Sequence, residues 1–482
     1  MANRLNASAD LFTCEYILFL QKYLLPLLGV VDGNVKPISE DIHITVKNNE
    51  TIYRTHDGYV FAASGNLVAY FSCPSGLSSD ELGLAKNIIN AFFLLAEHRM
   101  IGSRAEVRRL SEVQKDAIYR MAIQKGICDW VIGSENHEAE ILMNKLERWS
   151  VQTYEGRKVS FGFIINKDTT ATALSDKHGN WLEFMDSDYA AVLTDCIHSV
   201  IELDGKCNFT RYLSLQEGKR IPACSPRDEV PLRFASVIQK HVTGNNVGIF
   251  LLVNGDIIIA KRQQVRLVKR NLKWLNLSFS AFKNAIAKSD SDFVKDLSGK
   301  PDLLSKIYAS VLDVSFSHTG GIISVISHDD FFITNHVLSS CNGSEGVGLP
   351  SILAKSDILT SNVTEQEIQD EFTQSGIKKQ EQEKRLLKRT VLQKLVAGKT
   401  FAEMDRKLRN ELISWDGACI LDENGKVISF GAIIRNEKGS SEGGRGAAAK
   451  SLSKYGMAIK ISTDGYIELF VGGEEKPSYA IK

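Results

Sequence analysis

The sequence predicts a protein of mixed helices and strands, α/β in its C-terminal part and α+β overall. Short apolar runs bounded by turn-forming residues, such as Val159–Ile165, are typical of buried strands. In other segments apolar residues recur every three or four positions, which is typical of helices with one buried face. The dipeptide Asn254-Gly255 separates two apolar runs and predicts a hairpin turn.

The composition is that of a globular chain with balanced charge. Of the 482 residues, 43% are hydrophobic and 24% are charged, which excludes disorder over the whole chain. The 58 basic and 58 acidic side chains cancel, whereas nucleic-acid-binding proteins usually carry a basic excess. At roughly 100–200 residues per domain, this length predicts two to four domains.

No segment has the length and apolar character of a membrane span. The most apolar stretch, Tyr16–Val31, is interrupted by Lys22 and Pro26, so we expect a buried helix there. Asp10 and Glu15 lie where a signal peptide would need apolar residues. The eight cysteines form no C-x-x-C pair, which predicts reduced thiols without zinc in a cytoplasmic protein.

The first predicted region, residues 1–137, begins with a helix and continues with strands at Asp41–Val46 and Gly58–Cys73. Ser78 and Glu81 have the spacing of a capping box, which predicts that a helix starts there. Its apolar face would be formed by Leu84, Ile88, Phe92 and Leu95.

The second predicted region, residues 138–288, is expected to be a small α+β module. A helix through Ile141–Leu146 precedes the strand Val159–Ile165, and later strands flank Asn254-Gly255. A basic stripe follows, and we interpret it as a solvated strand face, with binding of an anionic ligand or nucleic acid as the alternative. The stripe consists of Lys261, Arg262, Arg266, Lys269 and Arg270.

The third predicted region, residues 289–482, has a helix at Leu303–Leu312 and a buried strand at Ile322–Ile326, and Leu353–Gly376 is expected to be a loop. The charged segment 377–409 is predicted to be helical with a solvated charged face, and nucleic-acid binding is the alternative. Its apolar face would be formed by Leu386, Leu387, Val391 and Leu395.

Two segments near the C-terminus suit nucleotide chemistry. Asp416-Gly417-Ala418 places a carboxylate directly before an apolar strand, and Ser440–Ser453 passes from a glycine-rich loop into an alanine-rich helix, with Arg445 at the junction. Glycines let a backbone approach a ligand closely, and a helix N-terminus attracts anions. The pattern predicts a phosphate site at Arg445 with Asp416 as a ligand for Mg²⁺ or Mn²⁺, and a simple turn is the alternative.

These segments, in their order, resemble the diadenylate cyclase domain. That family carries an Asp-Gly-Ala motif and then a Gly-Thr-Arg-His-Arg motif that opens a helix, and the corresponding segments here are Asp416–Ala418 and Gly443–Ser453. His318–Ile323 is similar to the family's Asn-Thr-Gly-Ala-Leu-Ile strand. The last two strands of the family resemble Met457–Ser462 and Tyr466–Val471. The resemblance covers Leu303–Gly473 and implies a central mixed sheet flanked by helices.

The resemblance implies a reaction and residue roles. Family members join two ATP molecules into cyclic di-AMP and release pyrophosphate, with one ATP and one Mg²⁺ or Mn²⁺ in each of two domains that meet face to face in a homo-oligomer. Asp416 would bind the metal and orient the attacking 3′-hydroxyl, and Arg445 would hold phosphate, so both are expected to be catalytic. The nucleotide would also be bound by Gly417, Ala418, Ile434, Glu442, Gly443, Gly444, Gly446 and Ser453.

The sequence departs from the family motif at several positions. Gly444, Gly446 and Ala447 stand where the family has Thr, His and its second Arg, and Lys454 replaces an acidic residue. Each lost charged hydrogen bond to phosphate is worth about 1.5–3 kcal/mol. The enzyme is therefore slow or inactive, unless other cations take over from Arg435, Lys438, Lys450 or Lys454.

The second region is similar to sensor domains that precede the cyclase domain in some bacterial proteins of mobile or defence-associated loci. The resemblance lies in Leu146–Ser150, in Tyr154–Arg157 and in the Asn254-Gly255 hairpin that leads to Trp274. The preferred function is synthesis of cyclic di-AMP or a related cyclic dinucleotide in antiphage signalling, gated by an unidentified ligand of this sensor. The alternatives are an inactive nucleotide-binding sensor or interaction protein and, less favoured, a nucleic-acid-responsive regulator. No membrane partner is expected.

Other reactive residue types have simpler interpretations. His318, His328 and His336 suit neither one helix face nor a zinc finger, so we expect them to lie in loops or at strand ends. Asp329-Asp330 is expected to form an acidic turn, and Cys419 a small residue of the buried core.

Overall fold

The computed structural model contains two compact units, which residue contacts divide into 1–224 with 234–278 and 225–233 with 279–482. The division into three predicted regions is finer than these two units and stays a prediction. The structure describes residues 15–28, 35–37, 51–55, 58–63, 66–72, 76–99, 111–133, 137–168, 181–215, 230–277, 279–327, 352–361, 363–434 and 443–481.

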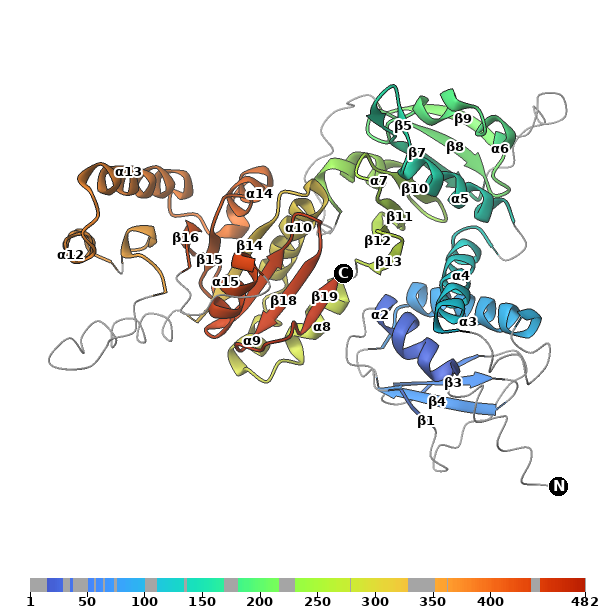
Figure 1. Ribbon diagram of the computed structural model, residues 1–482, viewed down its shortest axis with the longest axis horizontal. Coiled ribbons are helices and arrows are strands. Elements are labelled where there is room, and N and C mark those ends of the chain that lie inside the picture. Colours follow the sequence, from blue (N-terminus) through green and yellow to red (C-terminus); the bar gives the residue numbers. More distant parts are fainter. Residues whose placement is uncertain are drawn as a thin grey trace. The chain divides into compact units, whose positions relative to one another are not determined.

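The first unit contains two sheets (Figure 1). Among the described residues, one sheet has four strands in the order β1-β4-β3-β2, and all its pairs are antiparallel. Its strands are β1 (Lys36–Pro37), β2 (Ile52–Arg54), β3 (Gly58–Ala63) and β4 (Asn66–Ser72). The helical elements beside it are η1 (Leu20–Leu24), α2 (Leu25–Leu27), α3 (Ser79–Arg99) and α4 (Glu112–Val131).

The other sheet of this unit has, in the described part of the chain, seven strands in the order β13-β12-β11-β10-β7-β8-β9. Only the pair β7 and β8 is parallel among these strands. Its strands are β7 (Phe161–Asn166), β8 (Ser199–Asp204), β9 (Phe209–Ser214), β10 (Val247–Leu251), β11 (Ile257–Lys261), β12 (Gln264–Arg270) and β13 (Lys273–Asn276). The shorter elements are α5 (Glu138–Ser150), β5 (Thr153–Tyr154), β6 (Arg157–Lys158), α6 (Trp181–Phe184), η3 (Asp188–Val192) and α7 (Ala235–His241), while η4 (Leu232–Phe234) begins in the second unit and ends at Phe234 of the first.

The second unit is built on a mixed sheet whose described strands follow the order β16-β15-β14-β17-β18-β19. Only β14 and β15 run parallel to each other among these strands. The strands are β14 (Gly321–Ile326), β15 (Ala418–Leu421), β16 (Val427–Ala432), β17 (Gly456–Ile461), β18 (Ile467–Val471) and β19 (Tyr479–Ile481).

Helices cover this sheet (Figure 1). On one face, Ala449 of α15 and Phe372 of α12 share a buried cluster with Ile322 and Ala418. On the other face α14 packs beside the sheet, where its last residue, Ile413, contacts Gly321. The helical elements are α8 (Phe279–Ala287), α9 (Asp292–Leu297), α10 (Pro301–Ser317), η5 (Lys355–Asp357), α12 (Glu365–Ser375), α13 (Lys379–Val396), η6 (Phe401–Glu403), α14 (Arg406–Ile413) and α15 (Gly443–Ser453).

The mixed helix and strand content expected from the sequence is confirmed. The predicted capping box at the start of α3 forms, since Glu81 accepts from the Ser78 N–H at 2.7 Å and the Glu81 N–H donates to Ser78 at 3.3 Å. The hairpin at Asn254-Gly255 joins β10 to β11. The strand expected at Asp41–Val46 lies outside the described residues.

Two expectations about the second unit are wrong. The segment 353–376 is not a continuous loop, because α12 begins within it at a capping box formed by Thr364 and Glu367. The apolar face predicted for α13 is also displaced, because Leu387, Val391 and Leu395 are exposed whereas Leu392 and Val396 are buried. The charged residues on all sides of this helix obscured which leucines face the core.

No helix within the described residues is long and apolar enough to cross a membrane.

Gly126 and Gly83 provide a matched test of the contact between α3 and α4. A Cβ at position 126 would lie 2.4 Å from the Cα atom of Ile88, whereas one at position 83 would meet only the Trp130 ring, at 3.7 Å. We expect Gly126→Ala to lower the free energy of unfolding by roughly 1–3 kcal/mol through overpacking, and Gly83→Ala to raise it by up to about 1 kcal/mol through helix propensity. Urea unfolding followed by circular dichroism measures both changes, and equal effects would contradict this helix crossing.

Candidate functional site

The candidate site lies where the parallel strands β14 and β15 begin. Ile322 pairs with Ala418, so the residues just before each strand lie next to each other at one edge of the sheet. Each strand follows a helix directly, β14 after α10 and β15 after α14. The two connections are joined by a hydrogen bond of 2.9 Å between the hydroxyls of Thr319 and Ser414. The sheet edge therefore brings Gly320 beside Asp416.

Glycines make this edge compact. Gly417 has a φ of +112°, and a Cβ there would lie 2.5 Å from the carbonyl carbon of Gly431 on β16. A Cβ at Gly321 would lie 2.5 Å from the carbonyl oxygen of Ile413. Because no side chain fits at either position, the backbones of β14, β15 and β16 approach α14 and one another closely.

Asp416 is the exposed carboxylate of this edge. It precedes the buried strand β15, so its side chain stays at the surface while Ala418 enters the core. Exposed apolar side chains flank it, since Trp415 is 42% exposed and Ile433 is 59% exposed. The pairing of Ala418 with Ala432 places Ile433 beside the start of β15. The surroundings of Asp416 thus combine one carboxylate with apolar surface.

Helix α15 begins at the same edge. It leads into β17, which is antiparallel to β14 and ends opposite Gly321, because Gly321 pairs with Ile461. Arg445 lies in the first turn of α15, and its guanidinium packs against Gly320: a Cβ there would lie 2.5 Å from Nη1. Gly320 precedes β14 and Asp416 precedes β15, and adjacent strands are about 4.8 Å apart. Arg445 therefore contacts the chain one strand away from Asp416.

Some of the other predicted site residues are exposed at the edge, and others are buried in the core. Gly443 and Gly444 are exposed at the N-terminus of α15, where backbone N–H groups lack partners within the helix. Gly446 and Ile434 are buried, and Ile434 belongs to the hydrophobic cluster beneath α15. Glu442 lies outside the described residues.

Ser453 is not brought to this edge. It is the last residue of α15, buried, and its hydroxyl donates to the Lys450 carbonyl oxygen at 2.9 Å. At 1.5 Å per residue, it lies roughly 12 Å along the helix from Arg445. The helix expected from the sequence already implies this separation, because the rise per residue converts a short sequence interval into distance.

Of the cations expected to replace the missing motif residues, the two that the structure describes, Lys450 and Lys454, do not lie at the edge. Lys450 lies towards the C-terminal half of α15 and forms an ion pair of 3.1 Å with Glu475. Lys454 follows the end of that helix and packs against Gly473. Arg435 and Lys438 lie outside the described residues.

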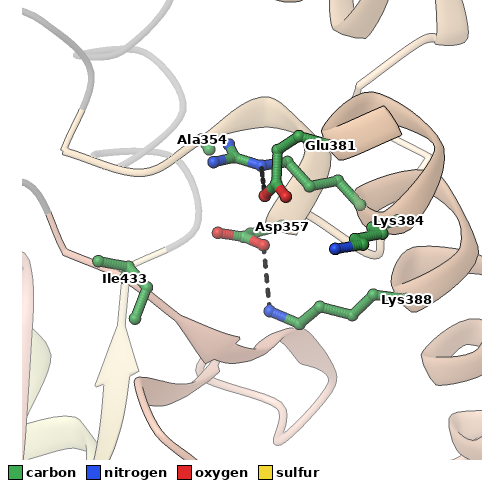
Figure 2. A pocket seen from close by; sticks show the side chains of 7 residues that line it. Ala354, Asp357, Glu381, Lys384, Lys388 and Ile433 are labelled. Carbon is green, nitrogen blue, oxygen red and sulfur yellow. Dashed lines mark hydrogen bonds and ion pairs between the residues drawn. The ribbon is translucent and has the colours of Figure 1, made fainter. Parts of the chain in front are cut away.

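Instead, α13 brings cations to the β16 side of the edge. A pocket of about 350 Å³ lies there (Figure 2), lined by Ala354, Asp357, Glu381, Lys384, Arg385, Lys388 and Ile433. Lys388 connects this pocket to Asp416: its Nζ donates to the Gly431 carbonyl at 2.7 Å, and a Cβ at Gly431 would lie 3.3 Å from the Asp416 carbonyl oxygen. Asp416 thus has a cation-bearing element on either side, α15 towards β14 and α13 towards β16.

The position of α13 is fixed by hydrogen bonds to the backbone of the segment that leads from η5. Arg389 Nε donates to the Ile358 carbonyl oxygen at 2.9 Å, and Gln393 donates to that of Leu359 at 3.0 Å. The Leu359 N–H in turn donates to the Ile428 carbonyl oxygen of β16 at 2.8 Å. The helix is therefore held against the sheet through an intervening backbone segment.

The pocket carries a net positive charge. Arg385 pairs with Glu381 at 3.1 Å and Lys388 with Asp357 at 3.3 Å, as the dashed lines in Figure 2 mark. Lys384 has no ion-pair partner among the described residues. From the sequence we interpreted the charged segment 377–409 as a solvated helix face. The four-residue spacing of Lys384 and Lys388 indicates that one side of this helix can present both cations together.

Two further expectations concern single residues. Cys419 lies in β15, and complete burial raises the pKa of its thiol well above the ordinary value, so it is a core residue as expected. His318 follows α10 and its Nδ1 lies 3.0 Å from the Thr463 carbonyl oxygen, which places it at a strand end. His328, His336 and Asp329-Asp330 lie outside the described residues.

The donor set at Asp416 suits one kind of metal binding. The described residues contain no group of three or more His, Cys, Asp or Glu side chains that could hold an ion. Mg²⁺ is commonly held by one or two carboxylates together with substrate phosphates and water. A single exposed carboxylate near a helix N-terminus fits that arrangement, in which the ion binds with the nucleotide.

Gly320→Ala tests the placement of Arg445. Gly320 has a φ of +72°, so a side chain is strained there and would also displace the guanidinium. We expect a loss of roughly 1–3 kcal/mol in the free energy of unfolding. In an Arg445→Ala background the loss should be smaller, because no guanidinium remains to be displaced. Chemical unfolding of all four proteins measures the difference, and an identical loss in both backgrounds would contradict the contact.

Comparison with protein-family models, with curated proteins and with solved structures finds no match to this chain.

Proposed function

We propose that the second unit is a nucleotidyltransferase of the diadenylate cyclase type, which condenses two ATP molecules into cyclic di-AMP or a related cyclic dinucleotide. The observation that supports this proposal is the shared sheet edge, where Gly320 lies beside Asp416 in the register of β14 and β15 and also contacts Arg445 at the N-terminus of α15. A carboxylate beside a guanidinium and free backbone N–H groups can orient a hydroxyl and hold phosphates at once.

In this proposal each residue has a defined task. Arg445 and the N–H groups at Gly443 and Gly444 hold the phosphates of one ATP, and Asp416 positions the 3′-hydroxyl. Mg²⁺ or Mn²⁺ bound with the nucleotide would neutralise phosphate charge. Each 3′-oxygen forms a bond to the α-phosphorus of the other ATP while the bond to pyrophosphate breaks, and the hydroxyl proton leaves to solvent. Two bonds form and two pyrophosphates depart for each cyclic product.

Helix α13 compensates for the departures from the family motif. The family's His and second Arg correspond to Gly446 and Ala447, which offer no side-chain donor. Lys384, Arg385 and Lys388 come from the opposite side of Asp416 and can supply positive charge to the polyphosphate. Cations at the wall of a pocket stabilise a phosphate more strongly than cations in open solvent, because less water screens them.

The reaction requires two nucleotide-bearing faces, so the active form would be a homo-oligomer. We further propose that the first unit senses a ligand and controls this assembly in antiphage signalling. A nucleotide-binding protein without turnover is the second candidate, and the observation that favours it is the lack of a side-chain donor at Gly446 and Ala447.

Asp416→Asn tests the catalytic assignment. The side chain is exposed, so the fold and melting temperature should not change, whereas formation of cyclic dinucleotide should fall on the order of 100-fold or more. The measurement is chromatography of products after incubation with ATP and Mg²⁺ or Mn²⁺. Asp302→Asn, in the first turn of α10 at its far end from β14, is the control. A rate for Asp416→Asn equal to that of the wild type would refute the role of this carboxylate, and ATP binding without any product from the wild type would favour the second candidate.

Lys384→Met tests the contribution of α13. We expect ATP to bind about three- to tenfold more weakly, because an exposed cation contributes less than a buried one. Lys394→Met, an exposed lysine in the last turn of the same helix, removes the same charge away from the pocket and should leave binding unchanged. Isothermal titration calorimetry compares the two variants. Equal affinities would mean that α13 does not contact the nucleotide.

A further inference from the structure

The basic stripe of the first unit divides into two parts with different surroundings. Arg270 is buried and forms hydrogen bonds of 2.7 and 2.9 Å to Asp256. Lys269 pairs with Glu147 and also donates to Gln124 at 3.1 Å. These two cations are each matched by a carboxylate in close contact, so they stabilise the fold.

The other three cations gather around a single carboxylate without such close contacts. Asp80, in the first turn of α3, lies 3.2 Å from Arg262, 3.3 Å from Arg266 and 3.8 Å from Lys261, all on the hairpin of β11 and β12. Its side chain is only 8% exposed, and its Oδ2 atom accepts no hydrogen bond from any described residue. One negative charge is therefore surrounded loosely by three positive charges.

A fourth cation lies at the end of the neighbouring strands. Val247 pairs with both Ile165 and Lys261, and Lys167 follows two residues after Ile165, so Lys167 and Lys261 project from the same face of the sheet. Burial and the neighbouring charge of Lys261 both lower the pKa of Lys167. Asp204, which pairs with Asn166 in the sheet, is the neighbouring carboxylate, and it also accepts from the N–H groups of Lys206 and Asn208 in its own turn.

The hairpin that presents Arg262 is conformationally unusual. Arg262 and Gln263 have φ values of +52° and +60°, at positions where Asn and Gly are usual. Gln263 fastens the turn to α7, since its N–H donates to the Val242 carbonyl oxygen at 2.8 Å. Lys261 is held in turn by the Trp130 ring, 4.5 Å from its Nζ. Strained positions that tertiary contacts hold in place are concentrated at functional sites.

We propose that Lys167, Lys261, Arg262 and Arg266 form a binding site for a small ligand that carries a phosphate group, with Asp80 holding the cations in place when no ligand is bound. Four cations against the two carboxylates Asp80 and Asp204 leave a net positive charge that favours an anion, and three of the cations already converge on one point. The ligand is small because the pairing of Lys269 and Arg270 interrupts the continuous stripe that a nucleic-acid backbone would need. This site is independent of the proposed cyclase activity.

The test is calorimetric titration of the full chain with inorganic pyrophosphate. All proteins carry both Arg445→Ala and Lys384→Met, which weaken phosphate binding at the proposed nucleotide site. We expect one pyrophosphate per chain and about three- to tenfold weaker binding on adding Arg262→Ala, whose side chain is half exposed and not needed for folding. Lys273→Ala, an exposed lysine on β13, is the matched control and should leave the affinity unchanged.

A second variant should act in the opposite direction. Asp80→Asn removes the competing negative charge while keeping the shape of the side chain, so pyrophosphate should bind more tightly. The proposal is overturned if pyrophosphate does not bind, or if Arg262→Ala and Lys273→Ala have equal affinities. It is also overturned if a single-stranded oligothymidylate binds through Arg262 while pyrophosphate does not. Loss of cyclase activity plays no part in these outcomes.

Discussion

The parallel pairing of β14 and β15 is the constraint on which the candidate site depends. It places the ends of α10 and α14 side by side, so Gly320 and Asp416 become neighbours although almost a hundred residues separate them. The helices are themselves joined, because Arg406 of α14 forms hydrogen bonds of 2.7 and 3.0 Å to the buried Asp313 of α10. Breaking one partner of such a buried pair is costly, so the register of the edge is strongly held.

The close approach of backbone segments determines which side chains can lie at that edge. Gly417 leaves no room for a side chain between β15 and β16, Gly321 leaves none between β14 and α14, and Gly320 leaves room for the Arg445 guanidinium. Glycine residues, which lack a Cβ atom, are therefore as necessary for this site as its charged groups. On its other side the α13 cations are supported by a backbone segment hydrogen-bonded to β16, which is a longer and more adjustable connection.

The two units use positive charge in different ways. Around β16 each of Arg385 and Lys388 has its own carboxylate, and the excess charge comes from the exposed Lys384. Around Asp80 three cations share one buried carboxylate. The arrangement around Asp80 has the higher electrostatic free energy, because burial removes water that would otherwise screen the repulsion between the cations. An anion that enters relieves that repulsion, which links binding to the energetics of the first unit.

The sequence by itself determined the local elements: the start of α3 at Ser78, the hairpin at Asn254-Gly255, and the strands that follow Gly320 and Gly417. Capping, turn formation and apolar runs are short-range effects, so neighbouring residues suffice to predict them. It also indicated Asp416 and Arg445 as a pair. Only the tertiary structure decided which cations accompany them, because it places Lys388 rather than Lys450 near the backbone of Asp416. It likewise divided the basic stripe, because charge compensation depends on which carboxylates the fold brings near: Asp80 of α3, Glu147 of α5 and Asp256 of the turn before β11.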